Sequence, residues 1–92
     1  MLQHLNIFLF GKVQGVFLRR TIRKEAKRLG IPGFVENKKD GSVYIEIEGS
    51  EAILEQFVLW LKSGAGKGDY EIKRVEVDKG EFKAFSGEFE IN

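Results

Sequence analysis

The spacing of apolar residues changes between residues 5–10 and residues 18–29, and this change constrains the fold more than any other feature. In residues 5–10 aliphatic residues occupy every second position, which is the period of a strand with one buried face. From residue 18 the apolar residues recur three or four positions apart, which predicts an amphipathic helix over 18–29. Gly30 and Pro32 end that helix, because glycine closes a helix readily and proline cannot continue it. The sequence therefore begins with a strand–turn–helix unit.

The turn inside this unit has the composition of an anion-binding site. The first backbone N–H groups of a helix have no partner within the helix, and the helix dipole places partial positive charge there. Gly15 allows a phosphate oxygen to approach the backbone closely, and Arg19 supplies a planar guanidinium that can grip two oxygens. The alternative is an ordinary junction in which the glycine and the arginine are purely structural.

The rest of the chain adds four strands and a second helix by the same criteria. Asp40-Gly41 predicts a hairpin turn between two of the strands, and Ser50 is the predicted N-cap of the second helix. The glycines of the connector 63–69 do not have the spacing of a nucleotide-binding loop. An irregularity is expected between 72 and 75, and a charged turn over 78–83. The four strands cover residues 33–37, 42–48, 70–77 and 85–91.

Strands and helices thus alternate as βαββαβ, followed by a short terminal strand. Crossover helices that join parallel pairs lie on one face of a sheet. We therefore predict an α+β fold, a ferredoxin-like two-layer sandwich with a mostly antiparallel sheet and both helices on one face. Residues 1–92 are expected to form a single domain.

Composition removes several classes of function. The chain has no cysteine, which excludes disulfides, thiolate metal sites and thiol catalysis. His4 is the only histidine; we expect it on the surface, at the frayed start of the first strand, and no metal site is predicted. No apolar run approaches the roughly 20 residues of a membrane span, and the opening residues do not resemble a signal peptide. We expect a cytoplasmic protein.

Charge is distributed unevenly along the chain. The net charge is +1, but residues 12–29 carry +6, which leaves −5 for the remainder. A positive field over the first turn and helix would attract small anions. The simpler alternative, a solvated helix face, accounts for most of these charges apart from Arg19.

The outward face of the predicted sheet suggests a competing function. Phe8, Phe10 and Tyr44 point outward and could stack bases, as in RNA-binding domains of the same element order. Glu46 and Glu48 are predicted on the same face and would repel a nucleic-acid backbone. The basic-glycine-aromatic motif typical of such domains is also missing from the third strand. Nucleic acid is therefore an unlikely partner.

Two motifs resemble the signatures of the acylphosphatase family. The first is Val13-Gln14-Gly15-Val16, followed by two residues and Arg19. The second runs from Gly33-Phe34 to Asn37-Lys38-Lys39-Asp40-Gly41. The resemblance covers nearly the whole chain, including the helix pattern at Phe57 and Trp60-Leu61.

This resemblance implies a hydrolase that cleaves the carboxyl–phosphate bond of acyl phosphates without a metal or other cofactor. It assigns phosphate binding to Arg19 and the backbone of the preceding turn, and water positioning to Asn37. The turn residues are Gln14, Gly15, Val16, Phe17 and Leu18. The expected partners are a small-molecule acyl phosphate and inorganic phosphate, as product or inhibitor, bound to a monomer.

The sequence departs from the family pattern in places. Leu18 replaces the usual phenylalanine, an apolar exchange of small effect, and the connector at 64–68 lacks the usual proline. Phe8 and Phe10 stand where polar residues are commoner, so a weak homodimer is an alternative to the monomer. A further alternative is an accessory domain that binds phosphate or carbamoyl phosphate without catalysis.

Overall fold

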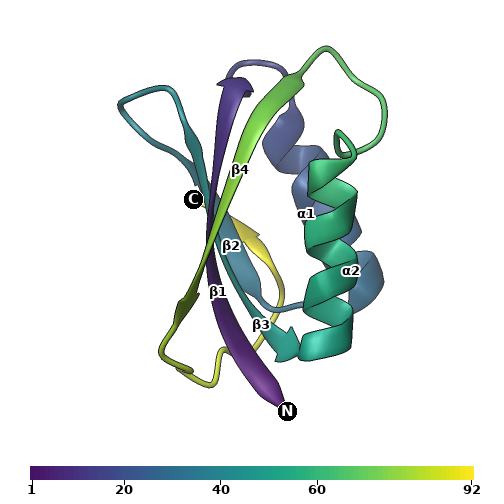
Figure 1. Cartoon of the computed structure of the whole chain (residues 1–92), viewed down its shortest axis with the longest axis vertical. Helices are drawn as coiled ribbons and strands as arrows, with labels where there is room; N and C mark the ends of the chain where they lie inside the picture. Colours follow the sequence, from purple (N-terminus) through teal and green to yellow (C-terminus); the bar gives the residue numbers. More distant parts are fainter.

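The computed structural model describes all residues from 1 to 92 and contains a five-stranded sheet covered on one face by two helices (Figure 1). The strand order is β4-β1-β3-β2-β5, and β5 lies parallel to β2 whereas the other neighbours are antiparallel. The predicted α+β ferredoxin-like sandwich is confirmed. In chain order the elements are β1 (Leu2–Lys12), α1 (Leu18–Leu29), β2 (Gly33–Asn37), β3 (Val43–Ser50), α2 (Glu51–Lys62), β4 (Glu71–Gly80) and β5 (Glu90–Ile91).

The hydrophobic core lies between the sheet and the two helices. The period-two positions of β1 and β3 face it, and both helices contribute their apolar stripe. Each fully buried aliphatic or aromatic side chain contributes about 1.5–3 kcal/mol to stability. The core residues contributed by these four elements are Leu5, Ile7, Leu9, Leu18, Ile22, Ala26, Val43, Ile45, Ile47, Leu54, Phe57 and Leu61.

The ends of the two helices follow the sequence signals. Helix α1 begins at Leu18 and ends before Gly30, which has a left-handed backbone with φ of 70°. Ser50 caps α2, where its hydroxyl oxygen accepts the N–H of Ile53 at 3.4 Å. Neither helix is long and apolar enough to span a lipid bilayer.

The predicted irregularity in the fourth strand is confirmed as a register shift. Phe10 pairs with Arg74 whereas Gly11 pairs with Ile72, so Lys73 is the extra residue. The strand nevertheless continues beyond its expected end, through Gly80.

The prediction of a last strand over 85–91 is wrong in its extent, since β5 contains only Glu90 and Ile91. At the start of this segment the backbone donors serve a side chain instead of a neighbouring strand. The backbone N–H groups of Lys83 and Phe85 each donate to the Glu48 carboxylate at 2.5 Å. Residues 81–85 therefore lie against the sheet face opposite the helices, and part of that face is covered.

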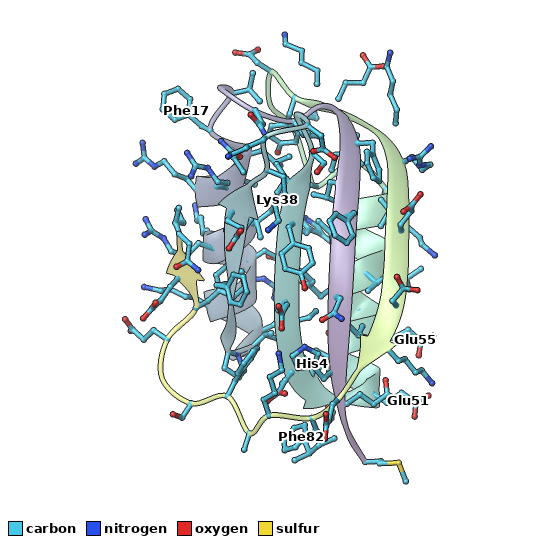
Figure 2. All side chains as sticks on the ribbon, turned by 90° about the vertical axis from the view of Figure 1, so that its left-hand side faces the viewer. His4, Phe17, Lys38, Glu51, Glu55 and Phe82 are labelled. Atoms are coloured by element: carbon cyan, nitrogen blue, oxygen red, sulfur yellow. The ribbon has the colours of Figure 1, made fainter.

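This covering segment also overturns the predicted exposure of His4 and Glu48. Each residue is only 2% exposed. The His4 Nδ1 atom lies 2.6 Å from a Glu48 oxygen, and its Nε2 atom lies 2.8 Å from a Glu46 oxygen and 2.9 Å from the Asn6 side-chain oxygen. The Phe85 ring meets the imidazole edge-on at 5.1 Å. Figure 2 shows His4 on this face, with the chain that carries Phe82 passing below it.

The hydrogen bonds around Glu48 make the stability of the folded chain depend on pH in the acidic range. Burial raises the pKa of the Glu48 carboxyl, but the N–H groups of Lys83 and Phe85 and the His4 ring outweigh this effect and hold that pKa below its ordinary value of 4.5. A lowered pKa contributes stability that is present above pH about 4.5 and is lost as pH falls through the folded-state pKa.

We therefore expect the free energy of unfolding to fall more steeply below pH 4.5 in the wild type than in Glu48→Gln, measured by urea titration at several pH values. At pH 7 the Glu48→Gln variant should be less stable by about 2–3 kcal/mol, because it loses charge-assisted hydrogen bonds in a buried position. Equal slopes in the two proteins would contradict this assignment.

Candidate functional site

The loop between β1 and α1 ends with an unusual helix start. Phe17 occupies the N-cap position with φ of 60° and makes no side-chain cap. Gly15 is also left-handed, with φ of 71°, and a Cβ added there would have no neighbour within 4 Å. These two residues turn the chain sharply and leave open space beside Gly15. Phe17 is 74% exposed and projects from the edge of the molecule (Figure 2).

The loop and the first turn of α1 carry unpaired backbone donors. Eleven backbone hydrogen bonds lie outside the regular elements, and none is donated by residues 14–20. No side-chain oxygen accepts these N–H groups either, and the first turn of α1 contains no acidic residue. Free N–H groups at the positive end of a helix dipole are suited to bind an anion.

A pocket of about 310 Å³ lies at this helix start. The predicted phosphate-binding residues Gly15, Phe17, Leu18 and Arg19 all line it, whereas Gln14 and Val16 do not. The other lining residues are Val13, Arg20 and Ile91. The sequence gives no signal for Arg20, because one basic residue on a basic helix looks like another, or for Ile91, because a distant strand supplies it.

Arg19 makes a hydrogen bond to the residue that follows β5. Its guanidinium donates from Nη1 to the backbone carbonyl of Asn92 at 3.1 Å. The backbone N–H of Asn92 in turn donates to the carbonyl of Val35 at 2.9 Å, next to the pairing of Val35 with Ile91. The remaining guanidinium donors of Arg19 make no hydrogen bond within the protein, which leaves them available to a ligand at the pocket.

Gln14 connects the loop to the hairpin that follows β2. Its side-chain amide donates to the backbone carbonyls of Lys38 at 2.7 Å and Ser42 at 2.8 Å. The two sequence signatures therefore meet where β1 and β2 end, at the top of Figure 1. The Gln14 side chain thus ties the loop to the hairpin.

Asn37 is the last residue of β2 and pairs with Val43. It lies two positions after the buried Val35 and therefore shares its core-facing side of the strand. The Asn37 side-chain oxygen is buried and has no hydrogen-bond partner within the protein. Asn37 is not among the residues that line the pocket. A buried acceptor without a protein partner is rare in folded proteins and points to an ordered water or a ligand.

Removal of the Gln14 amide is expected to loosen the contact between the loop before α1 and the hairpin after β2. The variant Gln14→Ala should lose about 1–3 kcal/mol of stability, because two carbonyls lose a part-buried donor. We also expect kcat for an acyl phosphate to fall about tenfold, since a misplaced loop lowers the rate. Thermal unfolding and steady-state kinetics would measure both effects. Gln56→Ala, on the exposed face of α2, is the matched control; equal behaviour of the two variants would refute the positioning role.

Comparison with known proteins gives a consistent result. The family model described as Acylphosphatase matches residues 5–91. An acylphosphatase of Archaeoglobus fulgidus is 40% identical over 95% of this chain and 94% of its own length. One of Thiobacillus denitrificans is 36% identical over 88% of this chain and 91% of its own. The crystal structure of acylphosphatase from Bacillus subtilis superimposes with a TM-score of 0.87 and 31% identity, covering 100% of this chain and 99% of that one.

The resemblance carried by the two signatures is therefore confirmed over nearly the full length of the chain, in sequence and in fold. This chain belongs to the acylphosphatase family.

Proposed function

We propose that residues 1–92 act as a single domain that hydrolyses acyl phosphates to a carboxylate and inorganic phosphate, with Arg19 and the turn of residues 14–18 binding the phosphoryl group and Asn37 positioning the attacking water. One observation carries the assignment of the site. Unpaired N–H groups and the Arg19 guanidinium belong to one pocket at the start of α1. The family membership of the chain supports the reaction itself.

The chemistry of an acyl phosphate explains why so few groups are needed. Its leaving group is a carboxylate whose conjugate acid has a pKa of roughly 4, so no general acid is required near neutral pH. The phosphoryl group passes through a state in which charge is spread over its equatorial oxygens. Fixed N–H donors and one guanidinium stabilise that charge without having to reorganise during the reaction.

The remaining task is to place a water molecule in line with the bond that breaks. The unpaired side-chain oxygen of Asn37 can accept a hydrogen bond from that water, which fixes its orientation. Holding two reactants in attacking geometry lowers a barrier by up to about 7–11 kcal/mol. The contact of Gln14 with the hairpin supports this role for Asn37, because it ties the neighbouring Lys38 carbonyl to the phosphate-binding turn.

We also propose that inorganic phosphate occupies the same turn as product and competitive inhibitor, and that the enzyme is a cytoplasmic monomer needing no cofactor. The absence of cysteine fits a reducing compartment. Phe8 and Phe10 are half-buried; the Tyr44 ring packs on Phe8 at 4.6 Å and the Arg74 guanidinium covers Phe10 at 4.1 Å. These contacts reduce the apolar area available for a homodimer.

The decisive experiment is hydrolysis of benzoyl phosphate in the presence of a chelator. We expect metal-independent release of phosphate and competitive inhibition by added inorganic phosphate. Absence of hydrolysis in the folded protein would refute the enzymatic assignment. Salt-dependent RNA binding without hydrolysis would instead favour the RNA-binding alternative.

A further inference from the structure

A second hollow, of about 520 Å³, lies beside the phosphate pocket along α1. The two share Phe17 and Arg20, so the hollow continues the pocket away from Arg19. Its remaining lining residues are Thr21, Arg23, Lys24 and Lys27. The wall of this hollow, which we call the basic hollow, therefore contains four cationic side chains and no carboxylate.

The cations of the basic hollow are largely unpaired. Arg20, Arg23 and Lys24 have no carboxylate oxygen within 4.0 Å, and Lys27 has only an exposed contact with Glu88 at 3.6 Å. Arg28, outside the hollow on the same helix, is by contrast bound by Glu25 through two hydrogen bonds of 2.8 Å. Uncompensated positive charge gathered in one concave surface favours an anion.

The arrangement of these residues gives the basic hollow a direction. Positions 20, 23, 24 and 27 follow the i, i+3, i+4, i+7 spacing of one helix face. The helix rises about 1.5 Å per residue, so the four cations extend over about 10 Å along its axis. The Arg20 guanidinium lies over the exposed Phe17 ring at 5.7 Å, at the boundary between pocket and hollow.

We propose that the basic hollow is the subsite for the carboxylic half of the substrate, and that it selects acyl phosphates whose acyl group carries a second anionic group. This inference rests on the proposed function, because the acyl chain enters the basic hollow only when the phosphoryl group is bound at Arg19. Phe17 contacts the carbon chain at the rim, and Arg23, Lys24 and Lys27 bind its terminal anion. The reaction at phosphorus is unchanged.

The test compares two substrates of equal chain length that differ in terminal charge, succinyl phosphate and butyryl phosphate. We expect the wild type to show a kcat/KM about tenfold higher for succinyl phosphate at low ionic strength. The difference should reside in KM, because the terminal anion is bound equally in the ground state and the transition state. It should shrink as salt is added, since exposed charges are screened.

The double variant Arg23→Gln/Lys24→Gln should lose the preference for succinyl phosphate and leave kcat/KM for butyryl phosphate within about twofold of the wild type. Lys67→Gln/Lys73→Gln is the matched control, because it removes the same net charge from exposed positions outside the basic hollow. This control should keep the preference.

Two outcomes would overturn the proposal: equal kcat/KM for both substrates in the wild type, or a preference that survives in Arg23→Gln/Lys24→Gln. In either case hydrolysis of butyryl phosphate would leave the proposed function intact. Failure of the wild type to hydrolyse either substrate would overturn the proposed function itself. Inhibition by heparin without any preference for succinyl phosphate would assign the basic hollow to a polyanion and refute the subsite.

Discussion

Replacement of Arg19 by alanine is expected to lower kcat/KM for benzoyl phosphate by about 1,000-fold or more. A guanidinium that stabilises the transition-state charge of a transferred phosphoryl group contributes roughly 10³–10⁵ in rate. Arg19 lines the pocket from the first turn of α1. Its guanidinium also donates a hydrogen bond to the backbone carbonyl of Asn92. The loss should affect both inhibition by phosphate and turnover, because the same group binds the ground state and the transition state.

Two further variants make this result interpretable. Arg19→Lys keeps the charge but loses the planar fork, so we expect an intermediate activity. Arg28→Ala removes an arginine from the other end of α1 and should leave kcat/KM within about twofold of the wild type, since its partner is only Glu25. Circular dichroism and thermal unfolding would verify that each variant is folded. A folded Arg19→Ala protein that retains a tenth of wild-type kcat/KM would refute the assignment.

The second large effect is expected from Asn37→Ala. Turnover should fall at least about 100-fold, because the attacking water is no longer held in line. The inhibition constant of inorganic phosphate should stay within about threefold of the wild type, since in our proposal phosphate binds the turn and not Asn37. Steady-state kinetics with benzoyl phosphate and with phosphate as inhibitor would separate the two effects. A parallel loss of phosphate affinity would instead identify Asn37 as a ligand contact.

Stability provides an independent readout for the same variant. The Asn37 side-chain oxygen has no hydrogen-bond partner within the protein, so its removal breaks no structural hydrogen bond and should leave the free energy of unfolding nearly unchanged. Most buried polar side chains behave in the opposite way. A large loss of stability in Asn37→Ala would indicate a structural hydrogen bond at this position. Lys39→Ala, at an exposed position of the same turn, is the control for local disturbance of the hairpin.

The sequence was sufficient to predict the features that depend on local signals. The bounds of α1 follow from apolar spacing and Gly30, and the start of α2 follows from the capping hydroxyl of Ser50. The core-facing side of β3 was also predictable from the local alternation of apolar residues. Val43, Ile45 and Ile47 are all fully buried, as that alternation predicts. These residues carry their own structural preference, and tertiary contacts reinforce it.

Contacts between distant segments could not be predicted. The sequence predicts that His4 and Glu48 are exposed, because nothing near them in the chain indicates that residues 81–85 cover them. The sequence predicts a longer strand than β5, because apolar Phe89 and Ile91 stand two positions apart. Only Glu90 and Ile91 pair with β2. In the candidate site the motif predicted Gly15 and Arg19, but the carbonyl that holds Arg19 lies 73 residues away. Such pairings depend on the whole chain's topology.

The hydrogen bond from Arg19 to Asn92 links the assembly of the site to the last step of chain closure. Contacts between segments so far apart form late, since the entropy of closing a long loop must be overcome before they contribute. Until β5 docks beside β2, the Arg19 guanidinium lacks this hydrogen bond. The recovery of enzymatic turnover during refolding would then lag behind the recovery of helical circular dichroism, which makes activity a kinetic marker for the docking of the final strand.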